Sequence, residues 1–180
     1  VGMMTVSRRS ILVALPLLGL AACATPPTTA ALVPEPPPGL VPAPAFRNAI
    51  AVGTVTVGRD SGTPWTSAVS PEQVREATVQ ALAKAGLGAA AGGRYRLDGT
   101  LMQLERPYAG FAMTVTATID WRLVDTTSGA VFYGKALKSL GSASLNDAVE
   151  NGPRLRIADQ RAVRANLQQL VQDLAALPGR

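Results

Sequence analysis

Residues 111–123 read FAMTVTATIDWRL, and every second side chain from Phe111 to Leu123 is apolar. The positions between them hold mainly threonines and charged residues. This period of two predicts a β-strand with one face in the core and the other in water. The run is longer than most strands, so we expect it to bend or to extend beyond its neighbours.

Three further strands are predicted around this one. Residues 125–129 (DTTSG) are typical of a hairpin turn, and the chain then returns as a strand over residues 130–138. Upstream, residues 95–104 alternate in the same way. Residues 49–57 form another predicted strand, with a bulge or bend expected at Gly53.

The first of two predicted helices begins after Ser70. This residue is expected to cap the helix, Pro71 suits the first turn, and Gln73 completes a capping box. Gly86 fits the left-handed residue that ends a helix.

The second predicted helix covers residues 154–177 and ends before Pro178-Gly179. Its apolar side chains form one stripe: Val163, Leu167, Leu170, Leu174 and Leu177. The residues expected to face water are Arg156, Asp159, Gln160, Arg164, Gln168 and Gln172.

The element order is therefore strand, helix, three strands, helix. We predict an α+β fold, a two-layer sandwich with an antiparallel four-stranded sheet and two helices on one face (β-α-β-β-β-α).

The N-terminal residues have the pattern of an export signal. Arg8 and Arg9 precede an uncharged apolar run, Ile11 to Ala22, which is short for a membrane-spanning helix and contains a proline. We predict a signal peptide over residues 1–22 rather than a membrane helix. Residues 7–12 also match part of a twin-arginine signal, although an ordinary basic start is the preferred interpretation.

Leu20-Ala21-Ala22-Cys23 resembles the lipobox of bacterial lipoproteins, and Cys23 is the only cysteine in the 180 residues. The resemblance implies cleavage before Cys23, acylation of its thiol, and anchoring of the chain to a membrane. Ala24 follows the cysteine where an aspartate would imply retention in the inner membrane, so the resemblance implies the outer membrane, on its periplasmic side. The alternative is a free or buried thiol.

Residues 23–45 are rich in proline and are predicted to form a lipid-anchored tether before a domain over residues 46–180. A polyproline II spacer of this length reaches roughly 70 Å at about 3.1 Å per residue. The alternative is a proline-rich ligand for the groove of a partner.

Composition argues against several classes of function. The formal net charge is only +5, and no dense basic run with aromatic residues supports nucleic-acid binding. The chain lacks histidine, and its carboxylates and serines show no spacing typical of catalysis or metal binding. We therefore predict a protein that is not an enzyme and needs no cofactor.

Two sets of residues are candidates for binding. The first is the water-facing side of the long strand, where Thr114, Thr116 and Thr118 form a ladder; the alternative is an ordinary solvent face. The second is a basic set, whose alternative is neutralisation by the interleaved acids Asp98, Glu105 and Asp120. Its members are Arg94, Arg96, Arg106, Arg122, Lys135 and Lys138.

Trp65 lies in a predicted polar loop. An exposed tryptophan there would be a binding anchor. We favour the alternative, that Trp65 folds back onto the core, because tryptophan is mostly buried in folded proteins.

The order of elements over residues 49–177 resembles small envelope lipoproteins of the YajG, lipopolysaccharide-assembly and ABC-transport-auxiliary types. We predict that the domain is a non-enzymatic interaction or assembly module in cell-envelope maintenance or transport, with an envelope protein as partner. The alternative is a carrier that holds a lipid or glycolipid between sheet and helices. An envelope hydrolase is the least favoured hypothesis.

Overall fold

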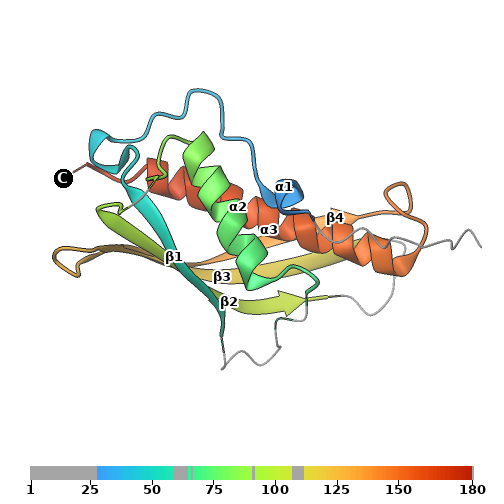
Figure 1. Ribbon diagram of the computed structural model, residues 1–180. Coiled ribbons are helices and arrows are strands. Elements are labelled where there is room, and N and C mark those ends of the chain that lie inside the picture. The colour runs from blue at the N-terminus through green and yellow to red at the C-terminus, as the bar shows by residue number, and fades with distance from the viewer. Residues whose placement is uncertain (1–27, 59–64, 66, 91, 107–111, 180) are drawn as a thin grey trace, which may run out of the picture.

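The computed structural model describes residues 28–58, 65, 67–90, 92–106 and 112–179. Two long helices lie on one face of a four-stranded sheet (Figure 1), so the predicted α+β class is confirmed. The elements are α1 (Thr29–Leu32), the 3₁₀ helix η1 (Pro44–Phe46), β1 (Ile50–Val57), α2 (Pro71–Lys84), β2 (Tyr95–Glu105), β3 (Met113–Asp125), β4 (Val131–Ala143) and α3 (Asn151–Ala175).

The sheet is mixed, so the prediction of a purely antiparallel sheet is wrong. The strand order is β1-β2-β3-β4; β1 runs parallel to β2, and the other two pairs are antiparallel. The chain passes from β1 to β2 through α2, and such a crossover returns it to the end of the sheet from which it started. The element order also differs from the prediction, because α1 and η1 precede β1.

The long strand β3 shows the predicted alternation of buried and exposed side chains over its thirteen residues. Its partner β4 is equally long and continues past the predicted end at residue 138 to Ala143. The bulge expected at Gly53 is confirmed by a shift in the β1–β2 register between Val52 and Val55. Phe111, the first residue of the predicted strand, lies outside the described residues.

The predicted start and stop of α2 are confirmed. Ser70 and Gln73 form a capping box, with hydrogen bonds of 3.2 Å and 2.9 Å between side chain and backbone. Gly86 has a φ of +69°, the left-handed conformation that glycine adopts readily. Leu82 accepts hydrogen bonds from the backbone N–H groups of Leu87 and Gly88, which turn the chain out of the helix.

A buried polar link joins α3 to the antiparallel strands β3 and β4. The indole Nε1 of Trp121 donates to Oδ1 of Asn166 at 2.9 Å. The Nδ2 of Asn166 donates to the Leu137 carbonyl at 2.8 Å and to Oγ of Ser139 at 3.1 Å. Ser139 in turn donates to the Ala162 carbonyl at 2.9 Å. Because both Trp121 and Asn166 are fully buried, these bonds satisfy groups that water cannot reach.

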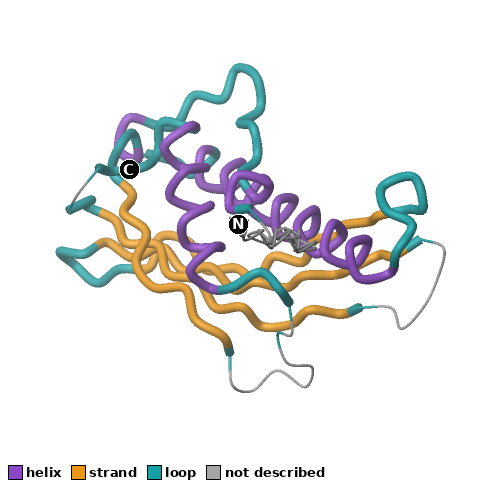
Figure 2. Tube along the Cα trace, turned by 45° about the vertical axis from the view of Figure 1, so that its right-hand side comes forward, coloured by secondary structure: helices purple, strands orange, loops and turns teal. Residues whose placement is uncertain are grey.

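Residues 28–46, which we call the strap, lie over α2 and α3 rather than forming the expected extended spacer. Leu32 is 0% exposed and Val33 4% exposed, and both belong to the main core cluster. Glu35 pairs with Lys84 of α2 at 2.6 Å. Figure 2 shows the strap on the helical side of the sheet, and no described residue covers the sheet's other face. Proline rings in this segment thus join the packing, although composition alone suggested a spacer.

We predict that Gly141→Ala destabilises the domain by about 1–3 kcal/mol, the usual penalty for overpacking a filled site. A Cβ at Gly141 would lie 2.1 Å from the Ala162 nitrogen and 2.2 Å from the Ala158 oxygen, both in the backbone of α3. Urea unfolding measures the change. Gly134→Ala in the same strand is the control, because its Cβ meets only a Val131 methyl at 3.7 Å. Equal losses in the two variants would contradict the close contact between β4 and α3.

Candidate functional site

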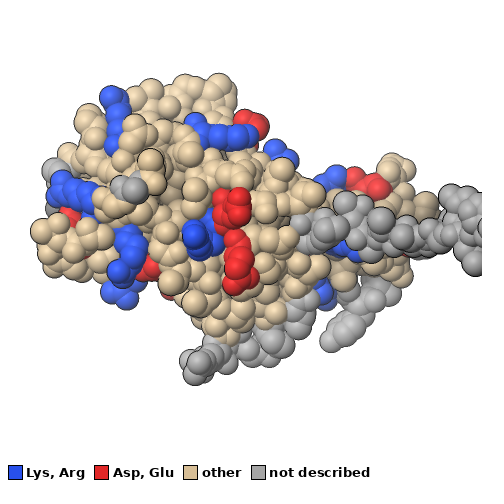
Figure 3. All heavy atoms as spheres, in the orientation of Figure 1, with Lys and Arg blue, Asp and Glu red and all other residues tan. Residues whose placement is uncertain are grey.

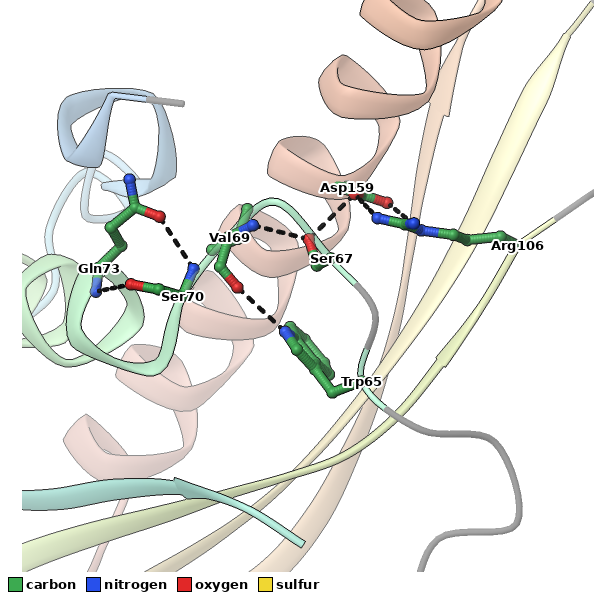
Figure 4. A network of polar contacts seen from close by, with 7 residues as sticks. All are labelled: Trp65, Ser67, Val69, Ser70, Gln73, Arg106 and Asp159. Atoms are coloured by element: carbon green, nitrogen blue, oxygen red, sulfur yellow. Dashed lines mark hydrogen bonds and ion pairs between the residues drawn. The ribbon is translucent and has the colours of Figure 1, made fainter. Parts of the chain in front are cut away.

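A polar clip formed by Ser67, Arg106 and Asp159 joins three parts of the fold. Asp159 is on α3, Arg106 directly follows β2, and Ser67 precedes α2 (Figure 4). Both carboxylate oxygens of Asp159 are bound by the Arg106 guanidinium, and Oγ of Ser67 donates to Oδ2 at 3.0 Å. The side chain of Asp159 is only 1% exposed, whereas that of Arg106 is 22% exposed. The clip is therefore a nearly buried ion pair at the rim of the two layers.

Burial controls the electrostatics of the clip. It raises the pKa of Asp159 above its usual value, while the ion pair with Arg106 and the hydrogen bond from Ser67 act in the opposite direction. Burying an ionised carboxylate without a partner costs free energy of folding. The guanidinium of Arg106 offsets this cost for the ionised form of Asp159.

The clip also organises the loop that leads into α2. Ser67 accepts a hydrogen bond from the Val69 backbone N–H at 2.9 Å while it donates to Asp159. An open depression of about 370 Å³ lies beside the clip, lined in part by Leu155 and Arg156. Because the Ser67 hydroxyl is engaged both as donor and as acceptor, its geometry fits a structural role rather than that of a nucleophile.

Trp65 folds back against the protein, in line with the favoured alternative. Its indole Nε1 donates to the Val69 carbonyl at 3.0 Å (Figure 4). Its ring packs against buried apolar residues of the core. The side chain is half-buried. Trp65 therefore covers the junction between the loop and the sheet instead of projecting from it.

The threonine ladder lies on the sheet face opposite the helices. Thr114 is exposed, Thr116 and Thr118 are half-buried, and Oγ1 of Thr114 lies 2.9 Å from Oγ of Ser142. In the register these three residues stand opposite Ser142, Leu140 and Lys138 of β4. We call these six residues the open face. Leu140 at its centre is 63% exposed, which is unusual for a leucine within a strand.

The basic set does not gather into one patch. Arg96 pairs with Asp98 at 2.9 Å, Lys135 with Asp173 at 3.0 Å, and Arg106 with the buried Asp159. Arg94 lies between Asp125, at 3.1 Å, and the ring of Tyr95. Lys138 is 3.9 Å from Glu105, and Arg122 stands opposite Asp98 in the register. The arrangement thus follows the alternative of mutual neutralisation, and Figure 3 shows basic and acidic side chains interspersed on one face of the molecule.

Sequence reasoning missed the buried polar residues of α3. Asp159 was expected to face water and is buried instead, which corrects that prediction; Asn166 was not singled out. Both lie within the apolar stripe, because Asp159 precedes Val163 by four residues and Asn166 follows it by three. A polar residue in register with a buried stripe is the signal that identifies them.

One apolar hollow lies at the end of the domain near the β3–β4 turn. It measures about 380 Å³ and is lined mainly by Phe46, Phe132 and Leu177 with neighbouring residues of the turn. Most of the space between sheet and helices is occupied by fully buried side chains such as Trp121, Leu97 and Leu167. A second, smaller apolar hollow of about 230 Å³ lies between β1 and α2 and is lined in part by Val52 and Val79. An apolar ligand would therefore find room at the end of the domain or between β1 and α2.

Two kinds of feature are absent from the described ranges. No group of three or more histidine, cysteine, aspartate or glutamate side chains is placed to hold a metal ion there. None of the helices that the structure describes is both long and apolar enough to cross a bilayer.

Comparison with known proteins places the fold. No known family model matches the sequence, and no curated protein sequence matches it significantly. A DUF330-family protein from Xanthomonas campestris has a similar structure, with a TM-score of 0.54 and 18% identity over 76% of this chain and 90% of that chain. This likeness shows that the two chains share a fold.

Weaker similarities extend to other bacterial proteins. PelC from Paraburkholderia phytofirmans has a TM-score of 0.49 at 17% identity, covering 75% of this chain and 94% of that chain. Lipoprotein GNA1162 from Neisseria meningitidis has a TM-score of 0.42 at 15% identity, covering 69% and 92%.

We predict that Arg106→Ala destabilises the domain by about 2–3 kcal/mol at pH 7, because it leaves the carboxylate of Asp159 buried without a cation. Removing the guanidinium raises the pKa of Asp159 further above its unfolded value. The folded state then binds a proton more tightly than the unfolded chain, so the loss grows as the pH rises through the raised pKa. It is small below about pH 4, where the carboxyl is protonated in both states. Unfolding measured from pH 4 to pH 8 checks this.

Lys135→Ala is the matched control, since it also removes a cation from a carboxylate of α3, here Asp173 with a side chain 25% exposed. We expect it to cost at most about 1 kcal/mol. A loss in Arg106→Ala that does not depend on pH would contradict the assigned role of the clip.

Proposed function

We propose that this protein is an envelope lipoprotein, anchored to a membrane through acylated Cys23, whose domain acts as a non-enzymatic interaction module facing the periplasm. The anchor is supported by the leader and by the lipobox-like Leu20-Ala21-Ala22-Cys23. Ala24 after the cysteine favours the outer membrane by resemblance to that family. Several acyl chains, each CH₂ contributing about 0.8 kcal/mol on burial, would make the attachment nearly permanent.

The observation that carries the interaction role is the uncovered sheet face. Both long helices lie on one side of the sheet in the described structure. The other side, which carries the six residues of the open face, therefore meets solvent along the thirteen-residue strands β3 and β4. Its hydroxyl groups can donate and accept hydrogen bonds, and the exposed Leu140 supplies an apolar contact. Lys138, one of its six residues, lies 3.9 Å from Glu105 of β2 and forms a weak ion pair with it. This combination suits a protein partner in the envelope.

A second candidate function is that of a lipid carrier, and the apolar hollow near Phe46 and Phe132 is the observation that favours it. The small volumes of this hollow and of the one between β1 and α2, about 380 Å³ and 230 Å³, argue for the interaction module, because a carrier of whole lipids needs a larger enclosed cavity. Mass spectrometry of the native protein without detergent separates the two. A copurified lipid in stoichiometric amount would favour the carrier.

We predict that the native protein has a mass that starts at Cys23 and includes acyl chains. Cys23→Ser removes the thiol that carries the lipid, so the variant is expected to be released from membranes or to keep its leader. Intact-mass measurement and membrane fractionation of both proteins check this. An unmodified Cys23 in a protein that fractionates away from membranes would overturn the anchor.

We also predict that a photocrosslinker at Thr116 captures an envelope protein in intact cells, since this residue lies in the centre of the open face. Leu140→Asp places a charge opposite Thr116 and is expected to abolish the crosslink while the domain stays folded. The same crosslinker at Arg75, an exposed position on α2, is the control. Equal capture from both positions would contradict a specific role of the open face.

A further inference from the structure

The strap determines where the chain leaves the folded domain. Helix α1 contacts both α2 and α3, and Leu32 and Val33 anchor the strap in the core. The Glu35–Lys84 pair and a hydrogen bond of 3.1 Å from Arg47 Nε to the Pro42 carbonyl hold its later part. Thr28, the first described residue, is therefore fixed on the helical side of the domain (Figures 1 and 2).

The leash between this point and the anchor is short. Only five residue steps separate Cys23 from Thr28. A fully extended chain spans at most about 3.3–3.6 Å per residue, so the leash reaches no more than about 17 Å. The roughly 70 Å expected for a free tether of the whole proline-rich segment is not available while the strap is bound.

This reach is smaller than the thickness of the domain. A helix with its side chains is about 10–12 Å across, and a sheet with its side chains occupies about 10 Å. The two layers together therefore measure about 20 Å, before the strap is added. A leash that starts above the helices would have to pass around the edge of both layers to bring the open face to the membrane, and about 17 Å is too short for that path.

We propose that the strap orients the anchored domain, with the helical layer toward the membrane and the open face directed away from it, into the periplasm. The inference rests on the proposed anchor at Cys23. In this orientation the outer surface of α2 and α3 faces the bilayer, and the open face stays accessible to a protein partner.

Charge on the helical layer is compatible with this orientation and does not by itself set it. On α2 the cations Arg75 and Lys84 are accompanied by Glu72 and Glu76, and Glu35 of the strap pairs with Lys84. Helix α3 adds the exposed Arg161 and Arg164, of which Arg161 pairs with Asp147. Anionic headgroups attract each cation near the surface by only about 1 kcal/mol. The short leash, rather than an electrostatic contact, therefore sets the orientation.

The test uses the acylated full-length protein in vesicles of phosphatidylethanolamine and phosphatidylglycerol. Cys23 is the only cysteine and is blocked by acylation, so Gln168→Cys on α3 or Lys138→Cys on the open face provides a single free thiol for a fluorophore. Energy transfer to acceptor lipids labelled in the headgroup measures each fluorophore's distance from the bilayer. We expect the Gln168 position to be closer by on the order of 20 Å, the thickness of the two layers.

A flexible insertion is the matched control. Twenty glycine and serine residues placed between Ala24 and Thr28 add a mean span of about 25 Å, so the difference between the two positions should collapse. Equal distances without the insertion, or a shorter distance for Lys138, would overturn the orientation while leaving the anchor intact. Absence of acyl chains from Cys23 in the mass of the same sample would overturn the anchor and the orientation together.

Discussion

The hydrogen bonds of the buried Asn166 amide fix how α3 lies on the sheet. Its oxygen accepts a hydrogen bond from Trp121 of β3, and its nitrogen donates to two groups of β4. One side chain therefore fixes the position of α3 relative to both strands. Sliding α3 by one turn, about 5.4 Å, would leave these groups buried and unpaired, at about 1–3 kcal/mol for each. Gly141 permits the same register, because only a residue without Cβ lets β4 approach Ala158 and Ala162 so closely.

This register explains why the helices cover one face of the sheet and leave the other free. The alternating apolar side chains of β3 from Met113 to Leu123 point to the side where Asn166 anchors α3, and the threonines consequently point away from it. The clip of Arg106 and Asp159 closes the rim of the same interface, and the capping box of Ser70 starts α2 beside it. The open face is thus a consequence of how the core is built, and its polar character keeps it compatible with solvent.

Period and turn chemistry were enough to predict most elements, because they are local properties. The alternation from Met113 to Leu123, the DTTSG turn and the Ser70 cap each depend on neighbouring residues only. The direction of a strand does not depend on neighbouring residues only. Alternation tells which face of a strand is buried but not whether the adjacent strand runs parallel or antiparallel, so β1 was wrongly predicted to be antiparallel to β2. The partners of Asp159, Arg106 and Ser67, lie 53 and 92 residues away in sequence, so their contact with Asp159 depends on the tertiary structure. The threonine ladder of the open face was predicted, whereas Leu140 at its centre, the clip and the apolar hollow near Phe46 were not.

The packing of the strap was also not predictable from local sequence, and this has a functional consequence. Proline content indicates a segment without regular hydrogen bonding, and it says nothing about Leu32 and Val33, whose burial depends on a groove formed by residues far along the chain. Burying two such side chains fully is worth about 1.5–3 kcal/mol each. The strap residues Pro34, Pro42 and Phe46 are also buried and add to the packing that offsets the lost backbone entropy. Once the strap is held, the freedom left to an anchored domain depends on the few residues before Thr28 and no longer on the whole proline-rich stretch. In the proposed orientation, packing on the helical layer would thereby turn a spacer into a device that selects which face of the domain meets the periplasm.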